Sequence, residues 1–241
     1  MYHNTVKIKA RLFCPYISFD METCFALEAK QAHYIRNVMR AKIGDYLGIF
    51  NGQQGEYAYQ IIQLDKKHVI VKPYQKIKDP LIPDAISLVF SIIKKTPLEY
   101  LVQKSTELGI GKLQPVITDR TMFRDVNLDR LEIIAIEAAE QCGLTDIPKI
   151  LPPQKLPDIM PQYQNIIFCD EKGGGVPIKQ CHSIDKQAID AILIGPEGGF
   201  TQSEADFLYQ QSNAHAVSLG NRIMRAETAA IASLAIIQAL R

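Results

Sequence analysis

The sequence predicts a two-part α/β protein: a small β-rich unit followed by a larger unit built on a mostly parallel sheet. Residues 1–75 hold several short extended runs separated by turn residues, which is typical of a small barrel. From residue 85 onward, buried apolar runs alternate with helical patterns, which predicts a parallel sheet covered by helices on both faces. Residues 76–84 carry two prolines and many charges, so we expect a linker there.

The composition narrows the class of protein. The chain has 241 residues, of which 47% are hydrophobic and 22% charged, as is usual for soluble globular proteins. No apolar run reaches the roughly 20 residues that span a bilayer, and no signal-peptide pattern opens the sequence. The five cysteines are odd in number and lack C-x-x-C spacing, which argues against a disulfide framework or a zinc site. We therefore expect a cytoplasmic protein without a membrane segment or a metal.

The charge is unevenly distributed along the chain. Residues 1–80 contain 12 Lys and Arg against 7 Asp and Glu, a net charge of +5, whereas residues 81–241 carry −4. A basic first third suggests contact with phosphate groups. The alternative is a chance imbalance of solvated charge, and charge alone does not separate the two.

The elements of the small unit follow from local patterns. Tyr46–Phe50 is an extended run followed by Asn51-Gly52, a strong turn dipeptide. Tyr57–Leu64 alternates loosely, and the short β-branched run 68–71 is stopped by Pro73. Residues 30–39 predict a short helix.

The larger unit alternates strands and helices up to the C-terminus. Buried strands are predicted at 86–93, 112–118, 165–169, 191–194 and 214–219, and helices at 97–108, at 131–142 and from Thr201. The segment 222–228 leads into a last helix, which begins after Glu227 and ends at about Leu240. The helix after Thr201 opens with a capping box, because Glu204 follows Thr201 by three residues.

Two strand ends with small turn residues lie close together near the C-terminus. Gly195-Pro196-Glu197-Gly198-Gly199 follows the strand 191–194, and Gly220-Asn221 follows the strand 214–219. Glycines let a backbone approach a ligand closely. Ligands of open α/β sheets bind outside the carboxyl ends of the strands, so these two turns predict a binding site.

The motifs around these turns resemble those of the ribosomal RNA small-subunit methyltransferase E family, which belongs to the SPOUT class of RNA methyltransferases. GPEGGF at 195–200 and the pattern SLG-x-RI-[ML]-R-x-ETA at 218–229 match nearly residue for residue. Weaker matches are Lys94 with 103–109, 137–143 with Pro148, and 33–40 with Gly44-Asp45. The resemblance covers nearly the whole chain, with one departure: Leu144 stands where the family usually has Arg.

The resemblance implies a fold, a reaction and partners. It implies a PUA-like RNA-binding domain at 1–75, a SPOUT methyltransferase domain at 85–241 with a C-terminal trefoil knot, and a homodimer. It also implies transfer of a methyl group from S-adenosyl-L-methionine to N3 of a uracil in the RNA of the small ribosomal subunit. No covalent enzyme nucleophile is needed for this reaction, because the cofactor is already activated.

The resemblance also implies which residues form the site. The expected cofactor-binding residues are Leu193, Ile194, Gly195, Pro196, Glu197, Gly198, Gly199, Ser218, Leu219, Gly220, Ile223, Met224, Arg225 and Thr228. Residues 168–171 would form a third loop, by analogy of position. Glu197 or Glu227 would accept the N3 proton, and Arg225 would hold a phosphate or stabilise the developing uracil anion. Alternatively, Arg225 and Glu227 form a structural pair that caps the last helix.

Basic residues are the expected RNA contacts. Arg36, Arg40 and Lys42 belong to the N-terminal motif, and Arg suits phosphate because its planar fork binds two oxygens. Further expected contacts are Arg11, Lys94, Lys104 and Arg120. Because Leu144 replaces the family's arginine, we expect either weaker RNA binding at that position or contacts from Arg120, Arg124 or Arg130 instead. Alternatively, Arg40 pairs with Asp45 to lock the turn, and His33 is a packed residue.

Two other functions compete with this interpretation. A nucleotide-binding enzyme is disfavoured because no G-x-x-x-x-G-K-[ST] occurs and no G-x-G-x-x-G follows a strand, while Gly173-Gly174-Gly175 leads into a polar loop. A non-catalytic RNA-binding or assembly protein would keep the fold but lose methyl transfer. Intact motifs at 195–200 and 222–228 argue against such a loss.

Overall fold

The computed structural model describes residues 6–81, 84–171, 174–183 and 189–240, which form two compact units. The smaller unit comprises residues 1–82 and 139–147, and the larger unit comprises 83–138 and 148–241. The predicted division at residues 76–84 differs from this in one respect, because the segment 139–147 belongs to the smaller unit. Residues 82–83 of the predicted linker, and Gly173, lie outside the described residues.

The smaller unit is a five-stranded sheet in the order β1-β3-β4-β5-β2. Its strands are β1 (Ile8–Phe13), β2 (Phe25–Ala26), β3 (Tyr46–Phe50), β4 (Glu56–Leu64) and β5 (Val69–Lys78). The pair β1–β3 is parallel and the other pairs are antiparallel. Buried side chains such as Leu12, Leu47 and Ile61 form its core.

The predicted helix at 30–39 is only partly an α-helix. The α-helix α1 spans Ala29–His33 and continues as a π-helix, η1, over Tyr34–Val38. The following Arg40 has φ 48°, which is the left-handed region that non-glycine residues rarely occupy. A segment of this kind is found often at functional sites, and the hydrophobic pattern alone does not reveal it.

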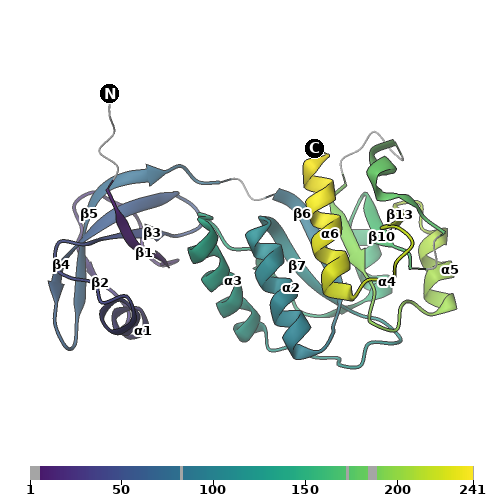
Figure 1. Ribbon diagram of the computed structural model, residues 1–241, viewed down its shortest axis with the longest axis horizontal. Coiled ribbons are helices and arrows are strands. Elements are labelled where there is room, and N and C mark those ends of the chain that lie inside the picture. Colours follow the sequence, from purple (N-terminus) through teal and green to yellow (C-terminus); the bar gives the residue numbers. More distant parts are fainter. Residues whose placement is uncertain (1–5, 82–83, 172–173, 184–188, 241) are drawn as a thin grey trace. The chain divides into compact units, whose positions relative to one another are not determined.

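The larger unit is built on a parallel sheet of eight strands, in agreement with the mostly parallel sheet that the sequence predicts. Strands β6, β7, β10 and β13 of this sheet are labelled in Figure 1. Along the sheet the order is β11-β13-β10-β12-β6-β7-β8, with β9 also pairing with β7. The strands are β6 (Asp84–Ser91), β7 (Ile110–Ile117), β8 (Lys149–Ile150), β9 (Gln154–Lys155), β10 (Ile166–Cys169), β11 (Val176–Pro177), β12 (Ala191–Ile194) and β13 (Ala214–Ser218). All the recorded strand pairs are parallel.

Helices cover both faces of this sheet. The helices are α2 (Lys95–Glu107), α3 (Leu128–Cys142), α4 (Leu156–Ile159), α5 (Gln202–Gln210) and α6 (Ala226–Ala239), with 3-10 turns η2 (Met160–Gln162) and η3 (Ile178–Ser183). Alternate residues of each strand enter opposite cores: Leu88 packs with residues of α2, α3 and α6, whereas Val89 packs with residues of α4 and α5. Successive side chains of a strand point to opposite faces of the sheet, and both faces of this sheet are buried. This explains why the strands appear in the sequence as continuous apolar runs.

The order of the strands separates two that are consecutive in the chain. Strand β13 lies between β10 and β11, although it comes later in the sequence than both. The chain therefore leaves β10 on one side of β13 and enters β11 on the other side. This order is consistent with the trefoil knot that the resemblance implies, and the knot stays a prediction.

Candidate functional site

The two turns that the sequence singles out open at the same edge of the parallel sheet. Strands β13, β10 and β12 are neighbours, and the loops that follow them line one cavity of about 460 Å³. Its lining residues are Cys169, Asp170 and Glu171 at the end of β10 and beyond; Ile194, Gly195, Pro196, Glu197, Gly199 and Phe200 at the end of β12 and beyond; and Leu219–Ala226 with Ala229 after β13. Such a size fits a small molecule of nucleoside dimensions.

Most of the predicted cofactor-binding residues meet in this cavity, but not all. Leu193 is fully buried in the core between the sheet, α4 and α5. Glu227, predicted as a catalytic residue, lies in the first turn of α6 and does not line the cavity. Gly198, Ser218 and Thr228 also lie outside the lining set. Sequence reasoning missed Phe200, Asn221, Arg222, Ala226 and Ala229. All five lie inside the two motifs at 195–200 and 218–229, so these motifs were the signal from which they could have been predicted.

Two of the three glycines in the turn after β12 are required by their surroundings. A β-carbon at Gly195 would lie 3.0 Å from the Phe200 ring, so the ring closes over the start of the turn. Gly199 has φ +66°, and a β-carbon there would overlap the carboxylate of Glu171. At Gly198 an added β-carbon would only make ordinary van der Waals contact with Arg120 Cδ, at 3.4 Å, so the surroundings do not require glycine there. The turn is therefore shaped by its neighbours as well as by backbone freedom.

A polar network holds this turn from the outside. The Gly199 N–H donates to the Pro196 carbonyl at 2.9 Å, and the Gly198 carbonyl accepts from Arg120 Nη1 at 2.5 Å, so both ends of one peptide group are fixed. The predicted capping box of α5 is confirmed between Thr201 and Glu204. Asp119 extends it, because its N–H donates to Glu204 Oε1 at 2.7 Å and its Oδ2 accepts from Thr201 Oγ1 at 3.0 Å.

The loop after β10 is held against β13 and α5. Asp170 Oδ2 accepts from the Tyr209 hydroxyl at 2.9 Å and from the Gly174 N–H at 2.8 Å. Burial, reinforced by this bond to Asp170, raises the pKa of Tyr209 to about 12, so the hydroxyl stays protonated as a donor. The Gly174 N–H is thus bound to a carboxylate and is not free to bind a phosphate. Burial also raises the pKa of Cys169 to about 12, which leaves its thiol neutral.

Replacing Gly175 with alanine is expected to destabilise the larger unit by about 1–3 kcal/mol or more, the cost of overpacking. An added β-carbon would lie 2.6 Å from backbone atoms of Ala216 and Val217, which cannot rotate away. At Gly174 the nearest atoms, 2.5 and 2.9 Å away, end the side chains of Tyr209 and Asp170, so Gly174→Ala should cost less. Urea denaturation of both variants measures the difference, and equal costs would contradict this explanation.

The three charged residues expected to act in the reaction, Glu197, Arg225 and Glu227, differ in their surroundings. Arg225 is exposed, lines the cavity and is the N-cap residue of α6, although its side chain makes no capping bond. Within the described residues, Arg225 and Glu227 form no recorded ion pair, so the structure gives no support to a pair that caps the helix. Glu197 is exposed at the cavity, beside the glycines of the turn.

The predicted RNA-contacting residues divide into exposed and engaged groups. Arg40 and Lys42 are exposed, and Asp45 accepts from the Lys42 N–H at 2.9 Å, with no recorded pair to Arg40 in the described part of the chain. Lys94 is exposed at the start of α2. Lys104 pairs with Glu107 at 2.7 Å, and Arg120 holds Gly198 as described above.

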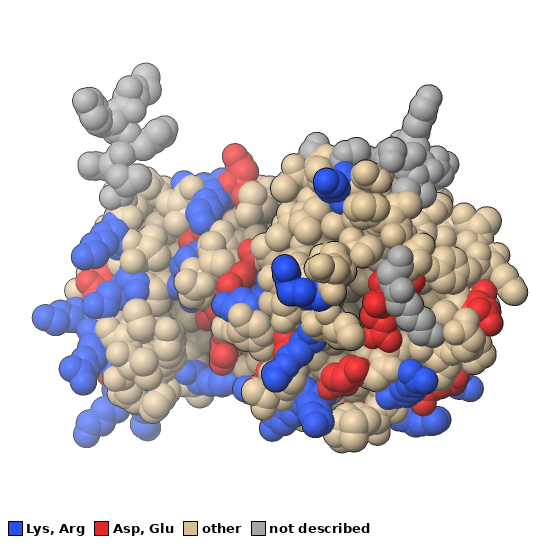
Figure 2. Space-filling view, turned by 45° about the vertical axis from the view of Figure 1, so that its right-hand side comes forward, with Lys and Arg blue, Asp and Glu red and all other residues tan. Residues whose placement is uncertain are grey.

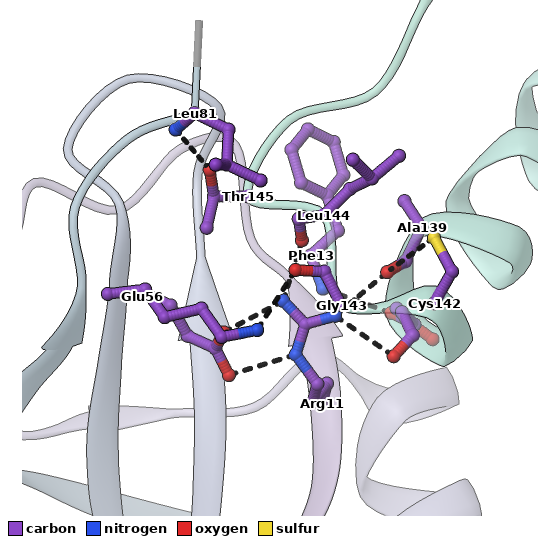
Figure 3. A network of polar contacts seen from close by, with 11 residues as sticks. Arg11, Phe13, Glu56, Leu81, Ala139, Cys142, Gly143, Leu144 and Thr145 are labelled. Carbon is purple, nitrogen blue, oxygen red and sulfur yellow. Dashed lines mark hydrogen bonds and ion pairs between the residues drawn. The ribbon is translucent and has the colours of Figure 1, made fainter. Parts of the chain in front are cut away.

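Arg11 departs most from its predicted role. Its guanidinium donates to both carboxylate oxygens of Glu56, at 2.9 and 2.8 Å, and to the carbonyls of Ala139, Glu140 and Leu144 (Figure 3). The Glu56 side chain is only 1% exposed and that of Arg11 13%. All three guanidinium nitrogens of Arg11 thus donate within the smaller unit, and none is left for a phosphate of RNA.

Arg36 supports a tight turn between β4 and β5. Its Nη1 donates to the carbonyls of Asp65 and Lys66, both at 2.9 Å. The Asp65 carboxylate accepts from the side chain of Gln63 and from the N–H groups of Lys67 and His68. These bonds, that from Gln63 first, lower the pKa of Asp65 to about 2.

The turn is expected to weaken in acid. Because the pKa of Asp65 is lower in the folded chain than its ordinary value of 3.8, its contribution is full at neutral pH and is lost as pH falls toward 2. Asp65→Asn should therefore speed amide exchange at Lys67 and His68 at pH 7 and make little difference at pH 2. A carboxylate titrating near 4 by NMR would contradict the prediction.

Neither a membrane span nor a metal centre emerges from the structure. Among the described residues, no helix has the length and apolarity to cross a bilayer. The same residues contain no group of three or more His, Cys, Asp or Glu that would hold a metal ion.

Comparison with known proteins gives matches over both units. Residues 80–238 match the family model of an RNA methyltransferase domain, and residues 27–74 match that of an RNA methyltransferase PUA domain. Ribosomal RNA small subunit methyltransferase E from Rickettsia conorii is 35% identical over 211 residues, covering 86% of each chain.

Solved structures agree with these sequence matches. Ribosomal RNA small subunit methyltransferase E from Neisseria gonorrhoeae, crystallised with S-adenosyl methionine, is 26% identical with a TM-score of 0.84, covering 96% of this chain and 97% of that one. A probable rRNA-methyltransferase from Porphyromonas gingivalis is 25% identical with a TM-score of 0.79, covering 96% and 98%. Together with the cavity and the motifs, these matches show that the chain belongs to the ribosomal RNA small subunit methyltransferase E family.

Proposed function

We propose that the protein transfers a methyl group from S-adenosyl-L-methionine to N3 of a uridine in the RNA of the small ribosomal subunit. The observation that carries this proposal is the cavity formed by three loops at the carboxyl ends of β13, β10 and β12, with Glu197 and Arg225 in its lining. The cofactor-bound relative from Neisseria gonorrhoeae supports the choice of cofactor.

The residues present fit this cofactor. The glycine turn offers backbone groups without side-chain bulk for an adenine, and Leu219 and Met224 offer apolar contact. When bound, the cofactor supplies a methyl group on a positively charged sulfur, which needs no further activation. The task left to the chain is to align the two reactants, which contributes on the order of 7–11 kcal/mol in favourable cases.

Two charged residues of the cavity take the remaining chemical roles. Arg225 stabilises the negative charge that develops on the uracil as the N3 proton leaves. Glu197 accepts that proton, since it lines the cavity whereas Glu227 does not. The target base has to be unstacked to reach these side chains.

The smaller unit supplies the RNA-binding surface. Figure 2 shows Lys and Arg side chains gathered over this unit. Its exposed cations are Lys7, Lys9, Lys30, Arg40, Lys42, Lys66, Lys67, Lys72, Lys76 and Lys78. Cations spread in this way bind a phosphate backbone with an affinity that falls as salt is added.

Arg40→Gly separates RNA binding from stability. Glycine removes the steric cost of φ 48° in the folded chain, but it raises the conformational entropy of the unfolded chain. The two effects on the free energy of unfolding are each about 1 kcal/mol and largely cancel. Stability should stay nearly constant while RNA affinity falls and the salt slope decreases by about one. Lys155→Ala, an exposed lysine on β9, is the control. Unchanged RNA affinity would remove Arg40 from the interface.

We further propose a homodimer in the cytoplasm, where ribosomal RNA is processed. The partial exposure of Ile236 and the 38% exposure of Leu240 leave apolar surface at the end of α6 for a second copy. Sedimentation equilibrium of the wild type and of Leu240→Lys tests this, since a dimer using this surface should be weakened by the charge. A monomeric wild type would overturn it.

The decisive experiment uses small ribosomal subunits from cells that lack the protein. The purified protein is added with methyl-labelled S-adenosylmethionine, and the labelled nucleoside is identified by mass spectrometry. Label in 3-methyluridine is the expected result. Cofactor binding without label would point to another RNA or assembly state as substrate. Absence of both would leave a non-catalytic RNA-binding protein.

A further inference from the structure

We propose that Glu171 is a binding residue for the nucleoside half of the cofactor, its carboxylate accepting hydrogen bonds from the ribose hydroxyls. The inference rests on the proposed function. It concerns a residue of the loop after β10, for which the two C-terminal motifs provide no counterpart.

The side chain of Glu171 spans two of the three loops of the cavity. Glu171 lies two residues after the end of β10 and lines the cavity. Its carboxylate reaches the turn after β12, because a β-carbon added to Gly199 would lie 1.6 Å from Oε1 and 2.4 Å from Cδ. The absence of a side chain at Gly199 therefore makes room for this carboxylate.

The carboxylate of Glu171 is available to a ligand. Within the described residues, neither of its oxygens has a recorded hydrogen-bond donor, and the nearby Gly199 N–H already donates to Pro196. The adjacent Asp170 differs, since its Oδ2 accepts from Tyr209 and Gly174. Asp170 thus fixes the loop, and Glu171 presents two acceptors at the cavity.

The order of the strands indicates which part of the cofactor Glu171 meets. Strand β10 lies between β13 and β12, so Arg222 and Arg225, which follow β13, belong to the flank opposite the glycine turn. Arg222, to which the proposed reaction gives no other role, suits the carboxylate of the cofactor's methionine end. Glu171 leans toward the glycine turn, where the nucleoside is expected. A carboxylate that accepts from ribose hydroxyls is a known means of nucleoside recognition.

Calorimetric titration with two ligands tests the assignment. S-adenosylhomocysteine carries both the nucleoside and the amino-acid end, whereas 5′-methylthioadenosine carries the nucleoside without the amino-acid end. Glu171→Gln should weaken both by a similar factor, about 10-fold to 100-fold for a charge-assisted hydrogen bond. The control is Glu132→Gln, an exposed carboxylate on α3, which should change neither.

The other outcomes each overturn a distinct statement. Weaker binding of S-adenosylhomocysteine alone would place Glu171 at the amino-acid end and refute the ribose contact. Unchanged binding of both ligands would remove Glu171 from the site while leaving the proposed function intact. A wild-type protein that binds neither ligand would overturn the proposed cofactor and this inference together.

Discussion

Replacing Arg11 with methionine is expected to destabilise the smaller unit by about 3–5 kcal/mol, the usual cost of breaking a buried ion pair from one side. Methionine keeps much of the aliphatic volume but leaves the Glu56 carboxylate, 1% exposed, without its main partner. Lys78 Nζ, 3.6 Å from Glu56 Oε2, compensates only in part. The variant also deprives three backbone carbonyls of a donor. Urea denaturation followed by circular dichroism measures the loss.

A double substitution shows whether the loss arises from the unpaired carboxylate. Arg11→Met with Glu56→Met removes both charges, and it should be less destabilised than Arg11→Met alone. Lys76→Met serves as the control, because it breaks an exposed ion pair with Asp79. It should lower the free energy of unfolding by less than about 1 kcal/mol. A double variant as unstable as the single one would show that the loss comes from the carbonyl contacts instead.

The sequence could not reveal this role of Arg11, because its partners are remote along the chain. Glu56 lies 45 residues away and Leu144 lies 133 residues away. A basic residue in a basic segment is interpreted as a phosphate contact when no acidic partner lies near it in the sequence. The same applies to the segment 139–147, whose local pattern is only that of a helix end followed by Gly143. Its place in the smaller unit is set by tertiary contacts.

The sequence was sufficient to predict those helices and strands whose formation depends mainly on their own residues. The buried run at 191–194 became β12 with the same bounds, and the capping box fixed the start of α5. The helix expected at 97–108 spans Lys95–Glu107, a shift of one or two residues at each end. The two-residue strands β8, β9 and β11 escaped prediction, because such short segments become strands only through the partner with which they pair.

The candidate site shows the same limit at the level of side chains. Both motif loops were expected at one edge of the sheet, and the structure brings them into one cavity. The bond from Arg120 to Gly198 and the approach of Glu171 to Gly199 join segments 78 and 28 residues apart. No local pattern specifies such contacts, since they arise from the order in which the strands are arranged.

Replacing Arg225 with methionine is expected to lower kcat by about 10²-fold to 10³-fold, the effect of removing a group that stabilises a developing negative charge. The fold should survive, because Arg225 contributes only backbone to the start of α6, where its carbonyl accepts from the Ala229 N–H at 2.9 Å. Affinity for the cofactor should change by a smaller factor, since Arg222 in the same loop supplies a second cation at the cavity. Single-turnover methylation of small subunits, with calorimetry of cofactor binding, separates these terms.

Arg222→Met is the matched comparison for this prediction. Both arginines line the cavity from the loop after β13, and each substitution removes one positive charge. If Arg225 acts on the reacting base, its loss should reduce kcat far more than the loss of Arg222. Equal reductions would mean that the summed charge of the loop matters and that neither guanidinium has a specific position in the reaction. A kcat within about three-fold of wild type, small beside the loss expected for a missing charge-stabilising donor, would exclude Arg225 from the chemical step. Stabilisation of the uracil anion would then have to come from backbone N–H groups of the two loops.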